Sequence, residues 1–358
     1  MRSYKESSPM PEITSVPRNS SLTLWKAQRN AGCVTRALTA LTPVLALVLA
    51  CAPQATPSAP PAVAAPEPVP VETPVAETVV EQKIPAVTIL SDVGFKTPES
   101  VHFDRKRDVY FVSHINGSPT DVDNNGFISK LTPQDNGQFK IDIKFIEAQK
   151  NGVTLNAPKG LTVSGDILYV ADIDRVRKFD AESGEALGEI VFDGATFLND
   201  LATGADGSIY VSDSGLTPSF TSSGSDAVYR LSTKDKVKKL ISGVKLGGPN
   251  GLLATEGGVW VTTFGSGELY WVSDKGEKTS VQKLPQGQND GLVFSSGGNL
   301  LISSWEGSNV LSAKPTEEFK VAISGLNAPA DIGYDCTRNS LLIPLFKEDK
   351  VVIHRFDN

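Results

Sequence analysis

Residues 86–358 are built from short runs of Val, Ile, Leu, Tyr and Trp that are separated by Gly, Asp and Asn turns. We find no long stretch with apolar residues at the i, i+3, i+4, i+7 spacing of an amphipathic helix. Short apolar runs bounded by turn residues are typical of β-strands. The pattern therefore predicts an all-β domain.

The runs recur as one unit, which begins with a polar pair and an apolar anchor and continues into a strongly apolar second strand. A third strand follows in each copy, and a fourth follows in the first five. The anchors are Val101, Leu161, Leu201, Leu252, Leu292 and Ile332, with spacings of 60, 40, 51, 40 and 40 residues. A four-stranded repeat of about 40 residues is typical of a propeller blade. Two β-sandwiches would not explain this recurrence, so we predict a six-bladed β-propeller of four-stranded antiparallel blades.

The sixth copy ends after three strands. We expect "VTIL" (87–90) to supply the missing outer strand by pairing beside "KVVIHRF" (350–356). This pairing would close the ring and remove an exposed sheet edge.

The polar pairs have a common place in this fold. The first strand of each propeller blade lines the central channel, so the residues just before the anchors should converge at one mouth. Two places before the anchors stand Glu99, Lys159, Asn199, Asn250, Asp290 and Ala330. One place before stand Ser100, Gly160, Asp200, Gly251, Gly291 and Asp331. We expect these strands to begin in a solvated pocket on the axis.

Glu99, Asn199, Asn250 and Asp290 offer oxygen donors from four blades. Two carboxylates and two amides suit a hard cation, above all calcium, and the absence of thiolates or a His cluster disfavours structural zinc. A cation would also offset the repulsion between the two carboxylates. Alternatively, these residues satisfy backbone groups and water, or act as turn formers. The spacing alone leaves both interpretations open.

Several of these stretches resemble the regucalcin/gluconolactonase (senescence marker protein) family and, more distantly, the paraoxonases. The matches are "PNGLLATEGGVWVTT", "NDGLVFSSGGNLLISSW", "NDLATGADGSIYVSDS" and "PESVHF", and the similarity covers essentially residues 86–358. The resemblance implies a six-bladed propeller with a divalent cation at the channel mouth. It places Asn250, Asp290 and Glu99 at metal-ligand positions and Asn199 in the metal or substrate shell.

The sequence also departs from the family pattern. Phe197 stands where an Arg often helps to bind sugar acids, and Leu201 replaces an expected Gly. Ser100 follows Glu99 where the family usually has Gly-Pro. The change at Phe197 argues against a sugar lactone as the substrate and leaves Phe197 as a candidate substrate-binding residue of another kind. Lys159 is expected to meet an anionic or carbonyl-bearing substrate, or else to form a salt bridge to a neighbouring carboxylate such as Asp200 or Glu99.

The resemblance implies metal-assisted hydrolysis of a small lactone or ester, if the protein is an enzyme. The cation would polarise the carbonyl and activate a water molecule. Asp290 or Asp200 would take the proton, and His114 is a second candidate base. The sequence leaves magnesium, manganese and zinc open beside calcium. The alternative is a non-catalytic propeller that binds a ligand or another protein and uses a cation only for stiffness.

The N-terminal region predicts export. Residues 37–50 form an uncharged apolar run after Arg29 and Arg36, which is typical of a secretory signal and too short to span a bilayer comfortably. "VLAC" resembles a bacterial lipobox, which would make Cys51 the lipidated first residue of the mature chain; otherwise the signal is cleaved elsewhere. The residue after Cys51 is not Asp, and by the sorting rule for such lipoproteins this favours the outer membrane.

The domain plan is a signal peptide (1–50), a Pro/Ala-rich tether (51–85) and the propeller (86–358). Frequent Pro favours extended polyproline geometry in the tether. The formal charge of −7 becomes −11 without the six basic and two acidic residues of 1–50. This acidic balance argues against nucleic acid. We expect a monomeric periplasmic or cell-surface lipoprotein that takes a small-molecule substrate or ligand and touches the membrane only through its lipid anchor.

Overall fold

The computed structural model describes residues 85–314 and 317–356 of the chain. Cys51, the predicted signal peptide and all but the last residue of the predicted tether lie outside the described residues. Apart from the short 3-10 helix η1 (Val244–Leu246), the described elements are strands. No helix in these two ranges has the length and hydropathy of a membrane span.

Six four-stranded antiparallel sheets form the blades. The first three are β2 (Pro98–Asp104), β3 (Val109–His114), β4 (Phe127–Pro133), β5 (Phe139–Glu147); β6 (Pro158–Ser164), β7 (Ile167–Asp172), β8 (Arg175–Asp180), β9 (Ala186–Val191); and β10 (Leu198–Thr203), β11 (Ile209–Asp213), β12 (Ala227–Leu231), β13 (Val237–Ser242). The others are β14 (Pro249–Thr255), β15 (Gly258–Thr263), β16 (Glu268–Ser273), β17 (Lys278–Lys283); β18 (Asn289–Phe294), β19 (Leu300–Ser304), β20 (Asn309–Ala313), β21 (Lys320–Ser324); and β22 (Gly333–Asp335), β23 (Ser340–Leu345), β24 (Lys350–Arg355), β1 (Val87–Leu90). The predicted six-bladed propeller is confirmed.

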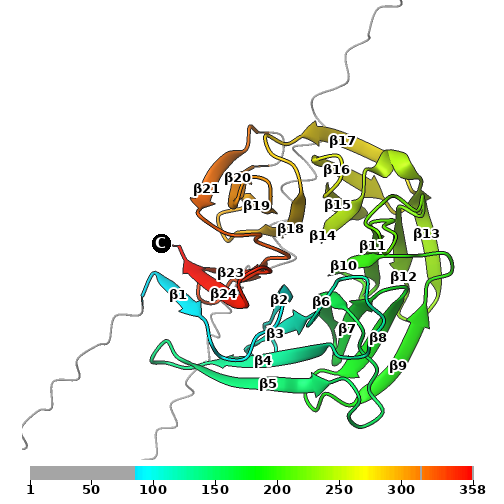
Figure 1. The fold of residues 1–358 in the computed structure, drawn as a ribbon. Helices are drawn as coiled ribbons and strands as arrows, with labels where there is room; N and C mark the ends of the chain where they lie inside the picture. The colour runs from blue at the N-terminus through cyan, green and yellow to red at the C-terminus, as the bar shows by residue number, and fades with distance from the viewer. Residues whose placement is uncertain (1–84, 315–316, 357–358) are drawn as a thin grey trace, which may run out of the picture. The chain divides into compact units, whose positions relative to one another are not determined.

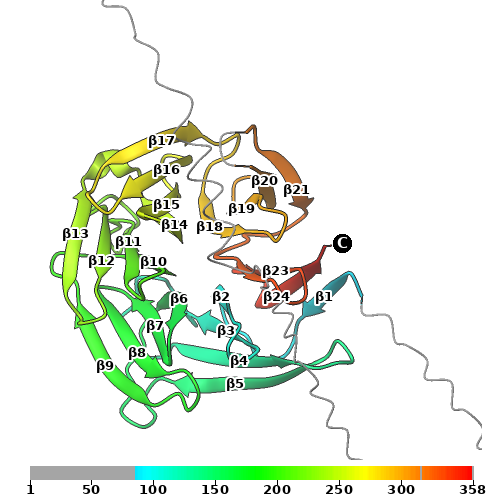
Figure 2. The ribbon, with the colours of Figure 1, turned by 180° about the vertical axis from the view of Figure 1, so that it is seen from behind.

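The blades follow one another around a central channel (Figures 1 and 2). Their first strands, β2, β6, β10, β14, β18 and β22, lie innermost, and each contacts the first strands of the two neighbouring blades. The ring closes as predicted. β1 pairs with β24 in antiparallel register, with Val87 opposite His354 and Leu90 opposite Val351.

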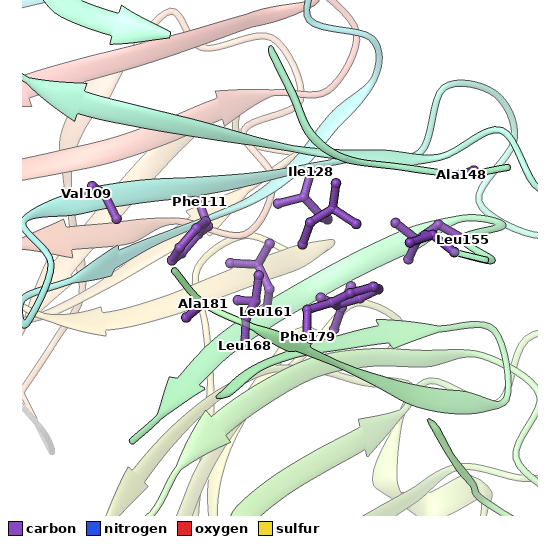
Figure 3. Packing of buried hydrophobic residues seen from close by; sticks show 12 residues of the cluster. Val109, Phe111, Ile128, Ala148, Leu155, Leu161, Leu168, Phe179 and Ala181 are labelled. Carbon is purple, nitrogen blue, oxygen red and sulfur yellow. The ribbon is translucent and has the colours of Figure 1, made fainter. Parts of the chain in front are cut away.

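The hydrophobic core lies between adjacent blades. All six predicted anchors are buried. In the cluster of Figure 3, Phe111 and Ile128 of the first blade pack against Leu161, Leu168 and Phe179 of the second. Burying a side chain of this size contributes about 1.5–3 kcal/mol, so each contact between blades adds substantially to the stability of the ring.

A β-bulge lies at the polar pair of each of the first five blades. Pro98 pairs with His114, but Val101 pairs with Val112. Two residues, Glu99 and Ser100, therefore lie opposite a single residue of the neighbouring strand. The same shift occurs before Leu161, Leu201, Leu252 and Leu292. A bulge takes residues out of the hydrogen-bonded ladder and redirects their side chains. It is therefore the device that directs the polar pairs toward the channel mouth.

Serine hydroxyls accept a backbone N–H in three of these bulges, and in two of them the hydroxyl also donates to the next blade. Ser212 Oγ accepts the N–H of Asp200 (2.9 Å) and donates to the carbonyl of Asn250 in the next blade (2.7 Å). Ser303 Oγ likewise accepts a bulge N–H (2.8 Å) and donates to the carbonyl of Ala330 in the sixth blade (2.8 Å). These bonds satisfy backbone groups that the bulges free, and they tie one blade to the next.

Candidate functional site

The bulges place the predicted polar residues in a buried group on the axis. Glu99, Lys159, Asn199, Asp200, Asn250 and Asp290 are each at most 6% exposed. Burial raises the pKa of Glu99 well above its usual value, and the charges of Asp290, Asp331 and Asp200 raise it further, while Lys159 lowers it. Side chains from five different blades therefore act on one another at this mouth.

Asn250 and Trp305 lie close enough to the Asp290 carboxyl to lower its pKa. Even so, three oxygen atoms of this group have no hydrogen-bond partner of normal geometry among the described residues. They are Glu99 Oε2, Asn250 Oδ1 and Asp290 Oδ1, which come from three different blades and are fully buried. Leaving such an atom unsatisfied costs about 1–3 kcal/mol, and native proteins rarely do so without a reason. The fourth predicted ligand is oriented by a neighbour, because Asn199 Nδ2 donates to Ser214 Oγ (3.0 Å).

This donor set fits an oxygen-liganded hard cation and does not fit a zinc site of the His/Cys type. In the part of the chain that the structure describes, no three His, Cys, Asp or Glu side chains form a group that could hold a metal ion. A cation here would depend on amide oxygens and water beside Glu99 and Asp290, a coordination that calcium accepts.

Asp331 joins the site as a carboxyl that sequence reasoning left without a role. Ser100 Oγ donates to Asp331 Oδ2, and a second side-chain hydrogen bond links Asp331 with Asp200. Burial raises the pKa of Asp331 to about 7, and these two hydrogen bonds partly oppose the shift. The pKa of Asp200 is also raised, by burial first and by Asp331 next. Because each carboxyl raises the cost of charging the other, the pair holds on to protons at a higher pH than two exposed carboxyls would.

Backbone amides hold Asp200 within this pair. Its Oδ1 accepts the N–H of Leu201 and its Oδ2 the N–H of Leu252, each at 2.6 Å. The carboxyl of Asp200 is thus fixed between the third and fourth blades, while the carboxyl of Asp331 is hydrogen-bonded by side chains. The sequence contained a signal for Asp331, since it occupies the same place in its repeat as Asp200.

Lys159 and Phe197, the predicted substrate-binding residues, contact each other. Lys159 is 1% exposed; its Nζ donates to the carbonyl of Ala157 (3.0 Å) and lies 4.4 Å from the centre of the Phe197 ring. Burial lowers the pKa of Lys159 to about 8, against the opposing charges of nearby carboxylates, Asp172 first. Within the described ranges, Lys159 forms no salt bridge to Glu99 or Asp200.

His114, the other candidate base, lies in a packed environment. Its ring stacks between Phe95 (5.1 Å between centroids) and Phe127 (4.3 Å). Nδ1 accepts the N–H of Lys96 (3.4 Å), and Nε2 is hydrogen-bonded to Ser129 Oγ (2.8 Å). Burial lowers the pKa of His114 to about 3, so the ring stays neutral. Both nitrogens are occupied, which is typical of a structural histidine.

Aromatic side chains at the rim of this mouth were missed from the sequence. Phe264, Trp305 and Phe346 each follow the second strand of their blade directly. The signal was present in the endings "TTF", "SSW" and "PLF" of the fourth to sixth repeats. The shared aromatic position can be recognised once the repeats are aligned by blade position.

No protein-family model and no curated protein matches the chain. Among solved structures, a gluconolactonase from Xanthomonas campestris superposes with a TM-score of 0.57 at 17% identity, over 78% of this chain and 93% of that chain. A streptogramin B lyase matches with a TM-score of 0.53 at 12% identity (75% and 97% of the chains). A catalytically inactive variant of virginiamycin B lyase from Staphylococcus aureus matches with a TM-score of 0.50 at 13% identity (76% and 100%). The predicted likeness to the gluconolactonase fold is confirmed, and the same fold is shared with lyases.

Proposed function

We propose that the chain hydrolyses a small ester or lactone at a divalent cation held by Glu99, Asn199, Asn250 and Asp290. The observation that carries this proposal is the set of three buried, unpartnered oxygens on the first, fourth and fifth blades. The gluconolactonase of similar fold supports the reaction class by analogy only, because fold alone does not fix function.

Calcium is the cation we expect, with magnesium, manganese or zinc as alternatives. Glu99, Asn250 and Asp290 would offer their unpartnered oxygens, and the hydrogen bond to Ser214 would hold Asn199 in position. When bound, such a cation polarises a carbonyl group and lowers the pKa of water. The two carboxylates would then be stabilised in their charged forms despite burial.

Asp331 and Asp200 are suited to move the proton. As the water oxygen adds to the carbonyl carbon, Asp331 accepts the proton that water releases. The same proton passes to the leaving oxygen when the acyl C–O bond breaks, which gives an acid and an alcohol, or one hydroxy acid from a lactone. A general base works best with a pKa near the working pH, and the pKa of Asp331 is about 7. Asp200, held by two amides, would stay fixed and keep Asp331 in place.

Lys159 would orient the substrate. Among the described residues its ammonium group makes one hydrogen bond, to Ala157, although it carries three donors. A substrate oxygen that carries negative charge could occupy a remaining donor. Phe197 covers the group and removes the polar contacts that a sugar acid would need.

We also propose that the protein is exported and anchored to the outer membrane through Cys51, as a monomer. Support comes from the apolar run and the lipobox-like "VLAC" of the sequence. Labelling of cells with a radioactive fatty acid should mark the protein, and Cys51→Ser should abolish the label. Labelling of the variant would refute the anchor.

The second candidate is a non-catalytic binding propeller with a structural cation. It is favoured by the same three unpartnered oxygens, which would hold a structural cation as readily as a catalytic one. It is favoured also by Lys159, whose charge lowers the pKa of Glu99 and so takes over part of a cation's role. In this case the protein would hold metal and bind ligands without turnover.

Elemental analysis of the purified protein, followed by a screen of lactones and aryl esters with and without chelator, tests the two candidates. We expect bound metal and chelator-sensitive turnover. Asp290→Ala should lose both, while Asp193→Ala, at an exposed loop position, should keep both. Normal activity of Asp290→Ala would refute the site, and metal without turnover of any substrate would favour the binding module.

A further inference from the structure

A pocket of about 440 Å³ lies between the fourth and fifth blades, apart from the axial group. One wall is the turn 264–267, which joins β15 to β16, and the other is the connection 283–288, which joins β17 to β18. Glu306, in the turn after β19, also lines the pocket. The described residues that line it include none of the carboxyls and amides of the axial group. A volume of this size can hold a small organic molecule.

Two opposite charges line this pocket without neutralising each other. Lys283 and Glu306 are exposed, and within the described ranges neither forms an ion pair. The Lys283 ammonium group donates to the backbone carbonyl of Ser266, and Glu306 Oε2 accepts the N–H of Gly287. Each charged group is therefore held by one backbone contact. Two N–H donors of the ammonium group and the second carboxylate oxygen stay available.

Gln286, a third polar residue of the pocket, is held by two buried amides. Asn289 Nδ2 donates to the Gln286 carbonyl (3.1 Å), and Asn309 Nδ2 donates to Gln286 Oε1 (2.8 Å). Asn289 and Asn309 are 0% and 3% exposed, and the Oδ1 atom of each has no hydrogen-bond partner among the described residues. Native proteins rarely leave such buried oxygens unpaired without a reason. Here the two amides fix the Gln286 side chain, so that its Nε2 donors can meet a ligand.

The amide at the start of the inner strand distinguishes the fifth blade. At the ladder position of Asn289, the first four blades have an apolar residue, which is Pro98, Pro158, Leu198 or Pro249. The side chain of Pro or Leu could not donate a hydrogen bond to the connection that precedes the strand. The hydrogen bonds to Gln286 are therefore not part of the repeated blade architecture, which indicates that they serve this pocket.

Glycines make room for the three polar side chains of the pocket. A Cβ at each glycine would collide with one of them, at 2.4 Å for Gly307 and Gln286 Oε1, 2.7 Å for Gly287 and Glu306 Oε2, and 2.9 Å for Gly267 and Lys283 Nζ. Gly287 and Gly307 do not have the positive φ that would by itself favour glycine. At these two positions the missing side chain therefore leaves space for the polar groups.

We propose that this inter-blade pocket, defined by Lys283, Gln286 and Glu306, binds a small zwitterion that carries one carboxylate and one ammonium group. Lys283 and Gln286 Nε2 would donate hydrogen bonds to the carboxylate, and the free oxygen of Glu306 would accept one from the ammonium group. A ligand with a single charge would leave the opposite charge of the pocket unpaired. The proposal is independent of the hydrolase, because the pocket shares no residue with the axial site.

Isothermal titration calorimetry of the full chain at low ionic strength tests the pocket. The probes are glycine, β-alanine, γ-aminobutyrate and ε-aminocaproate, which differ in the separation of their two charges. We expect one of them to bind at least about tenfold more tightly than the acid and the amine of the same chain length, such as butyrate and butylamine for γ-aminobutyrate. Lys283→Gln and Glu306→Gln should each weaken its binding about tenfold. Lys320→Gln and Glu318→Gln, exposed elsewhere in the fifth blade, are the matched controls and should bind as the parent does.

The outcomes are separable from a loss of folding. Since Lys283 and Glu306 are exposed, both glutamine variants should keep the urea unfolding midpoint of the parent. Unchanged affinity in both variants, or the absence of binding by all four zwitterions, would overturn the proposal. Binding that persists in both variants but is lost in Asp290→Ala would place the zwitterion at the channel mouth and overturn it as well.

Discussion

Replacing Asp331 with Asn should remove a proton-linked contribution to stability from the metal-free protein. The pKa of Asp331 is about 7 in the fold, against an ordinary value of 3.8. Between these values the folded protein holds a proton that the unfolded chain has released, so folding is favoured at low pH and loses this contribution as the pH rises through about 7. Asp331→Asn cannot titrate at this position, so the contribution should vanish in the variant.

The size of this contribution to stability follows from the same two pKa values of Asp331. One retained proton is worth about 1.4 kcal/mol per pH unit, so the two units between pH 5 and pH 7 give about 3 kcal/mol. The pKa values of His102 and His114 are lowered, to about 4 and about 3, and the histidines act with the opposite sign below pH 6.5. Lys159, with a pKa of about 8, acts with that sign above pH 8. The His and Lys terms cancel when the parent is compared with Asp331→Asn at each pH. The charge of Asp331 also raises the pKa values of Glu99, Asp200 and Asp290, so its loss in the variant adds to the difference in the same direction.

Urea unfolding with chelator at several pH values from 5 to 8 measures the effect. The unfolding free energy of the parent minus that of Asp331→Asn should fall by about 3 kcal/mol across the range, and Asp193→Asn, exposed in a loop, should run parallel to the parent. Calcium at about 100 times its Kd should add about 2.7 kcal/mol at pH 8 and much less at pH 5, because protons compete for the same carboxyls. Parallel curves for the parent and Asp331→Asn would refute the assignment of a buried, protonated carboxyl at this position.

Three further changes test the geometry of the ring. Gly251→Ala should destabilise the fold by about 2–3 kcal/mol in urea unfolding, because its Cβ would lie 2.1 Å from the carbonyl oxygen of Asp290. The control Gly297→Ala should be close to neutral, because the nearest contact of its Cβ would be at 3.7 Å. Ser303→Ala should cost about 1–3 kcal/mol by leaving bulge and inter-blade backbone groups unpaired; an unchanged unfolding midpoint would contradict that role. His114→Phe should lower the thermal midpoint yet keep any turnover measured at saturating substrate, and loss of activity in a folded variant would support His114 as a base.

The ring was predictable because its signals are local and repeated. Anchors such as Val101 and Leu252 recur at a fixed place before a strongly apolar strand, and that pattern specifies which face is buried. The closing strand 87–90 was also predictable, since a sixth blade with three strands needs an edge partner. Each strand pattern alone predicts little, but its repetition six times predicts the fold of the whole domain.

The site was only partly predictable. Blade position identified which residues gather at the mouth, but hydrogen bonding decides what each can do. His114 and Asp331 show the difference. A strand end gives no sign that the His114 ring stacks between two phenylalanines, or that Asp331 is hydrogen-bonded to Asp200. The packing of Trp305 likewise depends on contacts between blades, which a single sequence does not display.

The pairing of β1 with β24 sets the order of assembly. Val87 can meet His354 only after β24 has been synthesised, so the ring cannot close before that point. Any pull on the chain ahead of residue 85 would reach the ring first at this pair. The last bonds to form during folding would then be the first to open under mechanical load.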